Sequence, residues 1–268
     1  MKNTDKGNLN KEVNPVFDVA MEAGHILLQN GAEISRVEET MERICKYYGE
    51  EANDFFVLSN GIFTTGAYGT KNAYARVRHI PVKGARLDKV VAVNQLSREI
   101  EEGKYQQIDL VKEKLEEISN MPIEKSWQRI LASGIGSGFF CVLAGGCFAD
   151  CIAAFIAGIV LYIYVVFISE PYLSKILGNI FGGALIVTVC VLCFQLKIGT
   201  HLENIISGAI MPMVPGVAFA NGIRDIADGD YISGAVRLLD AILRFLCIAI
   251  GVGVAFSIYQ SMVGRIVL

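Results

Sequence analysis

Two prolines interrupt a long uncharged segment in the C-terminal half of the chain. Pro212 and Pro215, followed by Gly216, lie within residues 204–223, which carry no charge. Proline has no backbone N–H and its ring clashes with the preceding turn, so two prolines leave several carbonyl groups without helical partners. In lipid such groups are costly unless protein or water satisfies them. The pattern predicts a broken membrane helix that lines a solute or ion path, with a plain kink as the alternative.

Polar and charged residues follow this break closely. Asn221, Arg224 and Asp225 come first, and Asp228 and Asp230 come shortly after them. At the mouth of a solute path such groups could receive a carboxylate or a zwitterion, or relay a proton. An ordinary solvated loop is the alternative interpretation.

Three further charges stand near apolar segments. Asp150 separates the first two of them, and we expect it in the turn of a helical hairpin. Asp240 lies four residues before Arg244, a spacing that predicts an ion pair on one helix face. Charges at membrane depth are expensive, so any that is buried there becomes a functional candidate. The candidate transport path comprises Pro212, Pro215, Gly216, Asn221, Arg224, Asp225 and Asp150.

Motifs for catalysis or metal binding are sparse. Glu22 and His25 have the Glu-x-x-His spacing of carboxylate metal sites, but a second copy is missing, so a surface pair is expected. Cys190 and Cys193 form a CxxC inside an uncharged stretch, which favours packing over redox chemistry. The sequence contains no nucleophile elbow, no HExxH and no phosphate loop. We therefore predict no catalytic residue, metal or cofactor, and any pumping would draw on an ion gradient or another chain.

Charge is distributed unevenly along the 268 residues, and this predicts a membrane half. Residues 1–129 hold 18 of the 24 Lys and Arg and 20 of the 27 Asp and Glu. A bilayer core of about 30 Å needs about 20 helical residues. Five nearly uncharged windows meet that length and are predicted to span the membrane: 130–149, 151–169, 176–196, 204–223 and 245–264.

Basic residues near the ends of these spans predict the orientation. One side would collect Lys125, Arg129, Lys175, Arg224, Arg237 and Arg244, whereas the other would hold Lys197 and Arg265. Because cytoplasmic loops carry an excess of basic residues, the N-terminus is expected in the cytoplasm of a multi-pass membrane protein. With no basic stripe or aromatic platform, nucleic acid is not an expected partner.

The first 122 residues have the pattern of a small α+β domain. A polar segment, 1–13, is expected to be disordered. Ser35-Arg36-Val37-Glu38 has the pattern of a capping box at the start of a helix. The predicted helices are 14–30, 35–48, 87–102 and 107–119, and the predicted strands are 54–59, 62–65 and 73–80. The fold class is thus a membrane α-helical bundle of about five spans (123–268) preceded by a small cytoplasmic α+β domain (14–122).

Two ordered motifs resemble the threonine/serine exporter family. The first is the run 30–41, in which Glu33, Ser35, Arg36 and Glu38 are the polar motif residues. The second is Pro212–Gly216 with Asn221–Asp225 and Gly229-Asp230, and Gly145-Gly146 with Asp150 adds to it. The resemblance implies an inner-membrane exporter of threonine and serine driven by the proton gradient, with a split-gene branch linked to succinate. The chain is similar in length to the split form, which implies a second small multi-span membrane subunit.

Three hypotheses remain open from the sequence. The first is a transporter subunit that uses the broken span as the path of a small polar solute. The second is a membrane-tethered enzyme with its active site in residues 14–120, which the lack of a catalytic constellation disfavours. The third is a scaffold that holds a partner pore.

Overall fold

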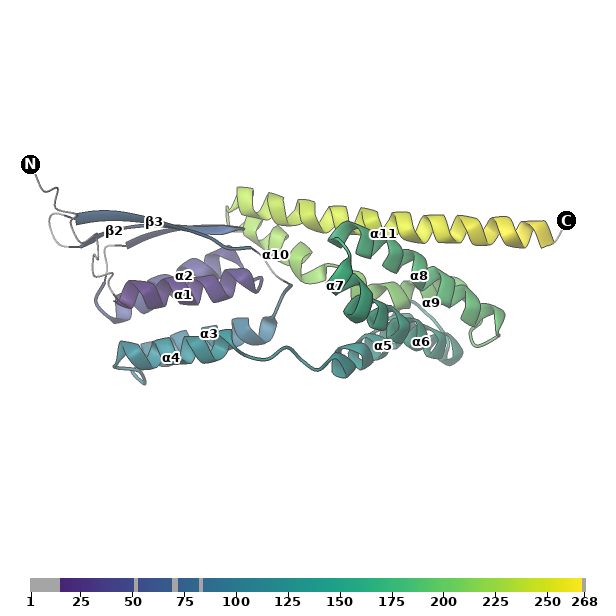
Figure 1. Ribbon diagram of the computed structural model, residues 1–268, viewed down its shortest axis with the longest axis horizontal. Coiled ribbons are helices and arrows are strands. Elements are labelled where there is room, and N and C mark those ends of the chain that lie inside the picture. Colours follow the sequence, from purple (N-terminus) through teal and green to yellow (C-terminus); the bar gives the residue numbers. More distant parts are fainter. Residues whose placement is uncertain (1–14, 51–52, 69–71, 82–83, 267–268) are drawn as a thin grey trace, which may run out of the picture. The chain divides into compact units, whose positions relative to one another are not determined.

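The computed structural model describes residues 15–50, 53–68, 72–81 and 84–266, so the predicted disordered segment 1–13 lies outside the described residues. The chain is mostly helical (Figure 1) and divides into two units. The first unit holds the residues up to Met121 together with Val217–Leu238. The second unit holds Pro122–Gly216 and the residues from Leu239 onward. The first unit is therefore discontinuous in sequence, whereas the domain expected from the sequence, 14–122, is one continuous stretch.

The N-terminal part of the first unit consists of three layers. Strands β1 (Asn53–Leu58), β2 (Gly61–Tyr68) and β3 (Asn72–His79) form an antiparallel sheet in the order β1-β2-β3. Helices α1 (Pro15–Gln29) and α2 (Ile34–Tyr47) lie between this sheet and helices α3 (Leu87–Glu101) and α4 (Ile108–Ser119) (Figure 1). These elements confirm the predicted helices and strands, except that β2 extends beyond the predicted range 62–65 to Tyr68, and Gly66 pairs with both neighbouring strands.

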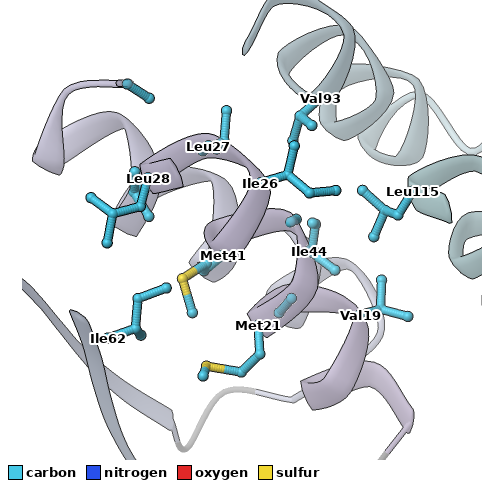
Figure 2. Packing of buried hydrophobic residues seen from close by; sticks show 14 of the residues in the cluster. Val19, Met21, Ile26, Leu27, Leu28, Met41, Ile44, Ile62, Val93 and Leu115 are labelled. Carbon is cyan, nitrogen blue, oxygen red and sulfur yellow. The ribbon is translucent and has the colours of Figure 1, made fainter. Parts of the chain in front are cut away.

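Helix α1 is the centre of this core. Its sequence is apolar on most faces, as expected for a helix covered by other elements on several sides. Figure 2 shows Val93 of α3 and Leu115 of α4 facing Ile26, while Ile62 of β2 faces Met41 of α2. Gly24 permits the close approach of α2, because a Cβ atom at this position would overlap the Met41 sulfur.

The second unit begins with an antiparallel helical hairpin. Helix α5 (Ser126–Leu143) is followed by α6 (Phe148–Tyr164), which continues through a π-helical turn, Val165–Ser169, into α7 (Glu170–Tyr172). The unit also contains α8 (Lys175–Gln195) and α9 (Leu202–Ile210). Helix α10 (Gly216–Ala227) leads back into the first unit, and the 36-residue α11 (Tyr231–Ile266) passes from the first unit to the second.

Three helices in the described part of the chain are long and apolar enough to cross a membrane: Phe148–Tyr172, Lys175–Gln195 and Tyr231–Met262. The interrupted pair Leu202–Met213 and Gly216–Ala227 makes a fourth if it forms one span. Helix α5, which covers part of the predicted span 130–149, is not among them. The structure thus supports three or four candidate spans where the sequence predicted five.

The boundary between α5 and α6 corrects one prediction. Helix α5 ends at Leu143 rather than near residue 149, because Gly145 adopts a left-handed conformation (φ 87°) and the N–H of Gly146 donates to the Cys141 carbonyl. Asp150 is therefore not in the turn but in the first turn of α6. The ion pair expected from Asp240 and Arg244 is confirmed, with 2.7 Å between Oδ2 and Nη2.

Glycines bring α8 and α11 into backbone contact. A Cβ atom at Gly183 would lie 2.6 Å from the Ile248 carbonyl oxygen, and one at Gly251 would overlap the Ile180 carbonyl group. Lipid supplies no hydrophobic drive for helix association, so close packing of this kind stabilises a membrane bundle. The CxxC residues Cys190 and Cys193 are buried on α8 in the apolar cluster of this unit, which confirms the packing interpretation.

Candidate functional site

The helix break predicted from the two prolines is present. Helix α9 ends at Ile210, Met211–Met213 form a single 3₁₀ turn, and α10 begins at Gly216. Val214 between them is extended (φ −62°, ψ 124°). A residue that precedes proline is forced out of the helical region by the proline ring, which explains the conformation of Val214 before Pro215. Two residues at this break, Met211 and Pro212, line a pocket.

This pocket lies within the second unit and has a volume of about 360 Å³. Small residues of α5 form one wall, and Tyr162 of α6 stands on another side. Met211 and Pro212 contribute the broken helix, while Glu124 and Arg129 contribute charge. Of the predicted path residues, Pro212 lines this open pocket. A cavity bordered by broken helix and charge is the arrangement in which a membrane protein can bind a polar solute.

Arg129 is the most informative residue of the pocket. Its guanidinium donates to both carboxylate oxygens of Glu170, at 3.2 Å for the Nη1–Oε2 bond, and lies 5.6 Å from the centre of the Tyr162 ring. The planar fork of arginine matches a carboxylate bidentately, and an aromatic ring beside it limits its rotation. The guanidinium of Arg129 is therefore fixed in position, with Glu170 as its carboxylate partner. The sequence interpretation used Arg129 only as an orientation marker and missed this ion pair.

A second site in the first unit joins the two sequence motifs. Asn221 donates to the Gly31 carbonyl at 2.8 Å, and Arg237 donates to the Ala32 carbonyl at 2.8 Å. The N–H of Ile34, at the start of α2, donates to Asp225 Oδ1 at 3.1 Å. Helix α10 and the first turns of α11 therefore bind the loop between α1 and α2. The predicted path residues Asn221 and Asp225 serve as its partners.

The charges of this network are paired. Asp225 Oδ2 lies 3.0 Å from Arg237 Nη1, and the Asp225 side chain is 0% exposed while that of Arg237 is 11% exposed. Arg224 forms an ion pair with Glu33, whose other oxygen lies 3.4 Å from Arg36. Arg224 and Asp225 thus contact the N-terminal motif, rather than standing alone at a mouth.

The predicted capping box at Ser35 is wrong. Helix α2 begins at Ile34 with Glu33 as its N-cap residue, and no side chain of the motif caps it. The Ser35 hydroxyl instead donates to Asp228 Oδ2 at 3.1 Å, and Glu38 accepts the N–H of Val57 at 3.0 Å. The Asp225 carboxylate caps α2 instead, because it accepts the N–H of Ile34, 191 residues away in the sequence.

Two carboxyl groups near this network, those of Glu38 and Asp230, have raised pKa values. Burial raises the pKa of Glu38, and the nearby Asp230 carboxylate adds to the rise, against the hydrogen bond from Val57 that lowers it. Burial also raises the pKa of Asp230, with a further contribution from Asp228. The carboxylates of Asp225, Glu33 and Asp230 lie near Arg237 and stabilise its nearly buried guanidinium.

Asp150 occupies a third place, in the second unit and away from the residues that line the pocket. Its Oδ1 accepts the N–H groups of Thr200 (2.6 Å) and His201 (3.0 Å), and its Oδ2 accepts the N–H of Cys147 (2.9 Å). His201 Nδ1 lies 2.9 Å from Oδ2. The fully buried carboxylate thereby caps the starts of both α6 and α9. Sequence reasoning missed Thr200 and His201, although a polar pair directly before an apolar segment could have indicated a helix start.

Comparison with known proteins supports the motif assignment. The family profile described as "Putative threonine/serine exporter" matches residues 18–259. The probable succinate transporter subunit YjjP of Escherichia coli is 23% identical over 248 residues, covering 91% of this chain and 94% of that protein. An uncharacterized protein of Schizosaccharomyces pombe is 23% identical over 190 residues, and the match covers 66% of this chain and about a fifth (22%) of the yeast protein. No solved structure matches the chain significantly. Because the family profile covers nearly the whole sequence and the helices are those of a membrane protein, the chain belongs to the threonine/serine exporter family.

Proposed function

We propose that this chain is one subunit of a secondary exporter, driven by the proton gradient, for small polar metabolites such as threonine and serine. Membership of the exporter family supports the transport role. The Escherichia coli relative is named a transporter subunit, which supports a second small multi-span membrane protein as the partner. The single observation that carries the proposal is the pocket that places Arg129 beside the broken helix at Pro212.

The charges of the pocket favour a zwitterion. Among the described residues that line it, Arg129 is the one cation and Glu124 the one carboxylate. A small amino acid could place its carboxylate on Arg129 in place of Glu170, which pairs with this guanidinium in the structure, and its ammonium group toward Glu124. A dicarboxylate would bring a second negative charge to the same acidic residue. Succinate export nevertheless remains the second candidate, because the Escherichia coli relative is named for it.

The polar residues after the break have a different proposed role. Pro215 and Gly216 lead from the pocket side of the break into α10, where Asn221, Arg224 and Asp225 bind the loop between α1 and α2. We propose that these three residues anchor the chain that leaves the break. Asp150 is proposed to hold the second unit together rather than to contact the solute.

An arginine series tests the solute site. In cells that also carry the partner subunit, Arg129→Gln should reduce export of labelled threonine and serine about 10- to 100-fold, as expected for one lost charge-assisted hydrogen-bond pair. Arg129→Lys keeps the charge but loses the planar fork, so an intermediate reduction is expected. Arg244→Gln is the matched control, because Arg244 forms a partly exposed ion pair with Asp240 outside the pocket. If the Arg129→Gln variant is expressed normally and exports threonine and serine at the wild-type rate, the proposed solute site is wrong. If the wild-type protein exports succinate but neither amino acid, the solute is a dicarboxylate rather than a zwitterion.

We also propose a topology of five spans, with α5 as the additional span and the N-terminus in the cytoplasm. The excess of basic residues at one set of helix ends supports this orientation. In a Cys147→Ser background, which removes the exposed native thiol, a cysteine introduced at Lys114 on the exposed side of α4 should resist an impermeant thiol reagent in intact cells and react after permeabilisation. The matched variant is a cysteine at the exposed Phe148, at the predicted outer end of the α5–α6 hairpin. Labelling of the Lys114 cysteine in intact cells would show that the N-terminal part lies outside the cytoplasm and would contradict the proposed topology.

A further inference from the structure

Three metal-ligand side chains of different types converge in the second unit, apart from the pocket. Cys147 precedes α6, Asp150 lies in its first turn, and His201 is the N-cap residue of α9. The Cys147 sulfur, an Asp150 oxygen and a His201 ring nitrogen all lie within 4.8 Å of one another. The ligands come from two turns about 50 residues apart in sequence, so local sequence spacing does not create the cluster.

The Thr200 hydroxyl shows that these ligand atoms face one point. Its Oγ1 lies 3.4 Å from Cys147 Sγ, 3.3 Å from Asp150 Oδ1 and 2.9 Å from His201 Nδ1. One oxygen atom thus contacts all three potential ligands. Rotation of the threonine side chain would free this point for an ion without any movement of the backbone.

The ligand set matches zinc in charge and in type. A thiolate and a carboxylate neutralise a divalent cation, and imidazole completes a set of borderline ligands that Zn²⁺ prefers. Zn–N distances of about 2.0–2.1 Å and Zn–S distances of about 2.3 Å place neighbouring donors of a tetrahedron about 3.3–3.6 Å apart. Because the ligand atoms lie within 4.8 Å of one another, the widest pair has to close by at most about 1.5 Å, which rotation of the exposed Cys147 side chain can supply.

Access and support are also present. The His201 side chain is 54% exposed and Cys147 is exposed, so an ion can enter from solvent. Asp150 is buried and fixed by the backbone N–H groups of Cys147, Thr200 and His201, which would remain in place when a metal binds. Outer hydrogen bonds of this kind orient metal-binding carboxylates.

We propose that Cys147, Asp150 and His201 bind Zn²⁺, with a fourth position left to water, and that the ion fastens the α5–α6 turn to the turn between α8 and α9. This site is separate from the solute pocket, so its presence or absence does not depend on the transport proposal. Zinc would lower the mobility of the two turns without entering the solute path.

Metal titration of the purified full-length chain tests the proposal. After chelator treatment in detergent, the wild type should bind one Zn²⁺ per chain in competition with a chromogenic indicator. Cys147→Ser and His201→Asn should each weaken binding at least as much as loss of an outer-shell partner does, about 10- to 100-fold. Both side chains are exposed, so neither substitution should unfold the protein, and the elution volume and melting temperature verify this.

Cobalt identifies the ligands directly. The wild type loaded with Co²⁺ should show a thiolate-to-metal charge-transfer band that Cys147→Ser abolishes. His79→Asn, which removes an exposed histidine of the first unit, is the control and should change neither the affinity nor the band. Failure of the wild type to bind Zn²⁺ stoichiometrically, or an unchanged cobalt band in Cys147→Ser, would overturn the proposal.

Discussion

Asp225→Asn should destabilise the first unit by about 3–5 kcal/mol, the usual cost of leaving one partner of a buried ion pair without its counter-charge. The substitution keeps the shape of the side chain but leaves Arg237 charged and nearly buried. It also weakens the acceptor for the first N–H of α2. Hydrogen exchange of the peptide around Ile34 and chemical denaturation of the full-length chain would both detect the loss.

Two matched variants distinguish the cost of an unpaired buried charge from the general effect of removing a carboxylate. Asp240→Asn breaks a more exposed ion pair and should cost only about 0–1 kcal/mol. The double variant Asp225→Asn with Arg237→Met removes both buried charges and should recover part of the lost stability. If Asp225→Asn instead keeps wild-type stability and exchange but loses export, Asp225 acts in transport, as its position after the broken span first suggested.

Asp150→Ala should destabilise the second unit by about 3–6 kcal/mol, because the N–H groups of Cys147, Thr200 and His201 lose a common acceptor at about 1–3 kcal/mol each, offset in part by water. The loss also removes a negative charge from two helix starts. The melting temperature of the full-length chain in detergent measures the effect. Asp150→Asn keeps one acceptor oxygen and should lie between the alanine variant and wild type. An alanine variant that melts with the wild type would show that water replaces the carboxylate.

Local patterns predicted the elements whose causes are local. Gly31 (φ 83°) follows the end of α1, close to the end of the predicted helix 14–30, and the prolines break the fourth apolar segment where they occur. The end of α5 was misplaced because counting charges cannot detect a left-handed glycine inside an apolar run. Gly145 stops the helix several residues before the first charge, Asp150.

The sites were harder to predict because their partners are distant in sequence. Ser35 and Glu38 satisfy the local pattern of a capping box, yet Asp228 and Val57 bind them instead. Arg129 acquires its fixed geometry from Glu170, which is 41 residues away. A single sequence indicates which residue types are available, but it does not show which of two satisfactory partners is closer in the folded chain.

The discontinuous first unit has a consequence for biosynthesis. The loop between α1 and α2 forms hydrogen bonds with Asn221, Asp225 and Arg237, which are 190–205 residues away and are therefore synthesised much later. At about 5–20 residues per second, a ribosome needs on the order of ten seconds to proceed from Met121 to Leu238. During that interval the N-terminal layers remain without these three partners. A nascent chain that stalls before α10 would thus leave the start of α2 without the Asp225 carboxylate that caps it.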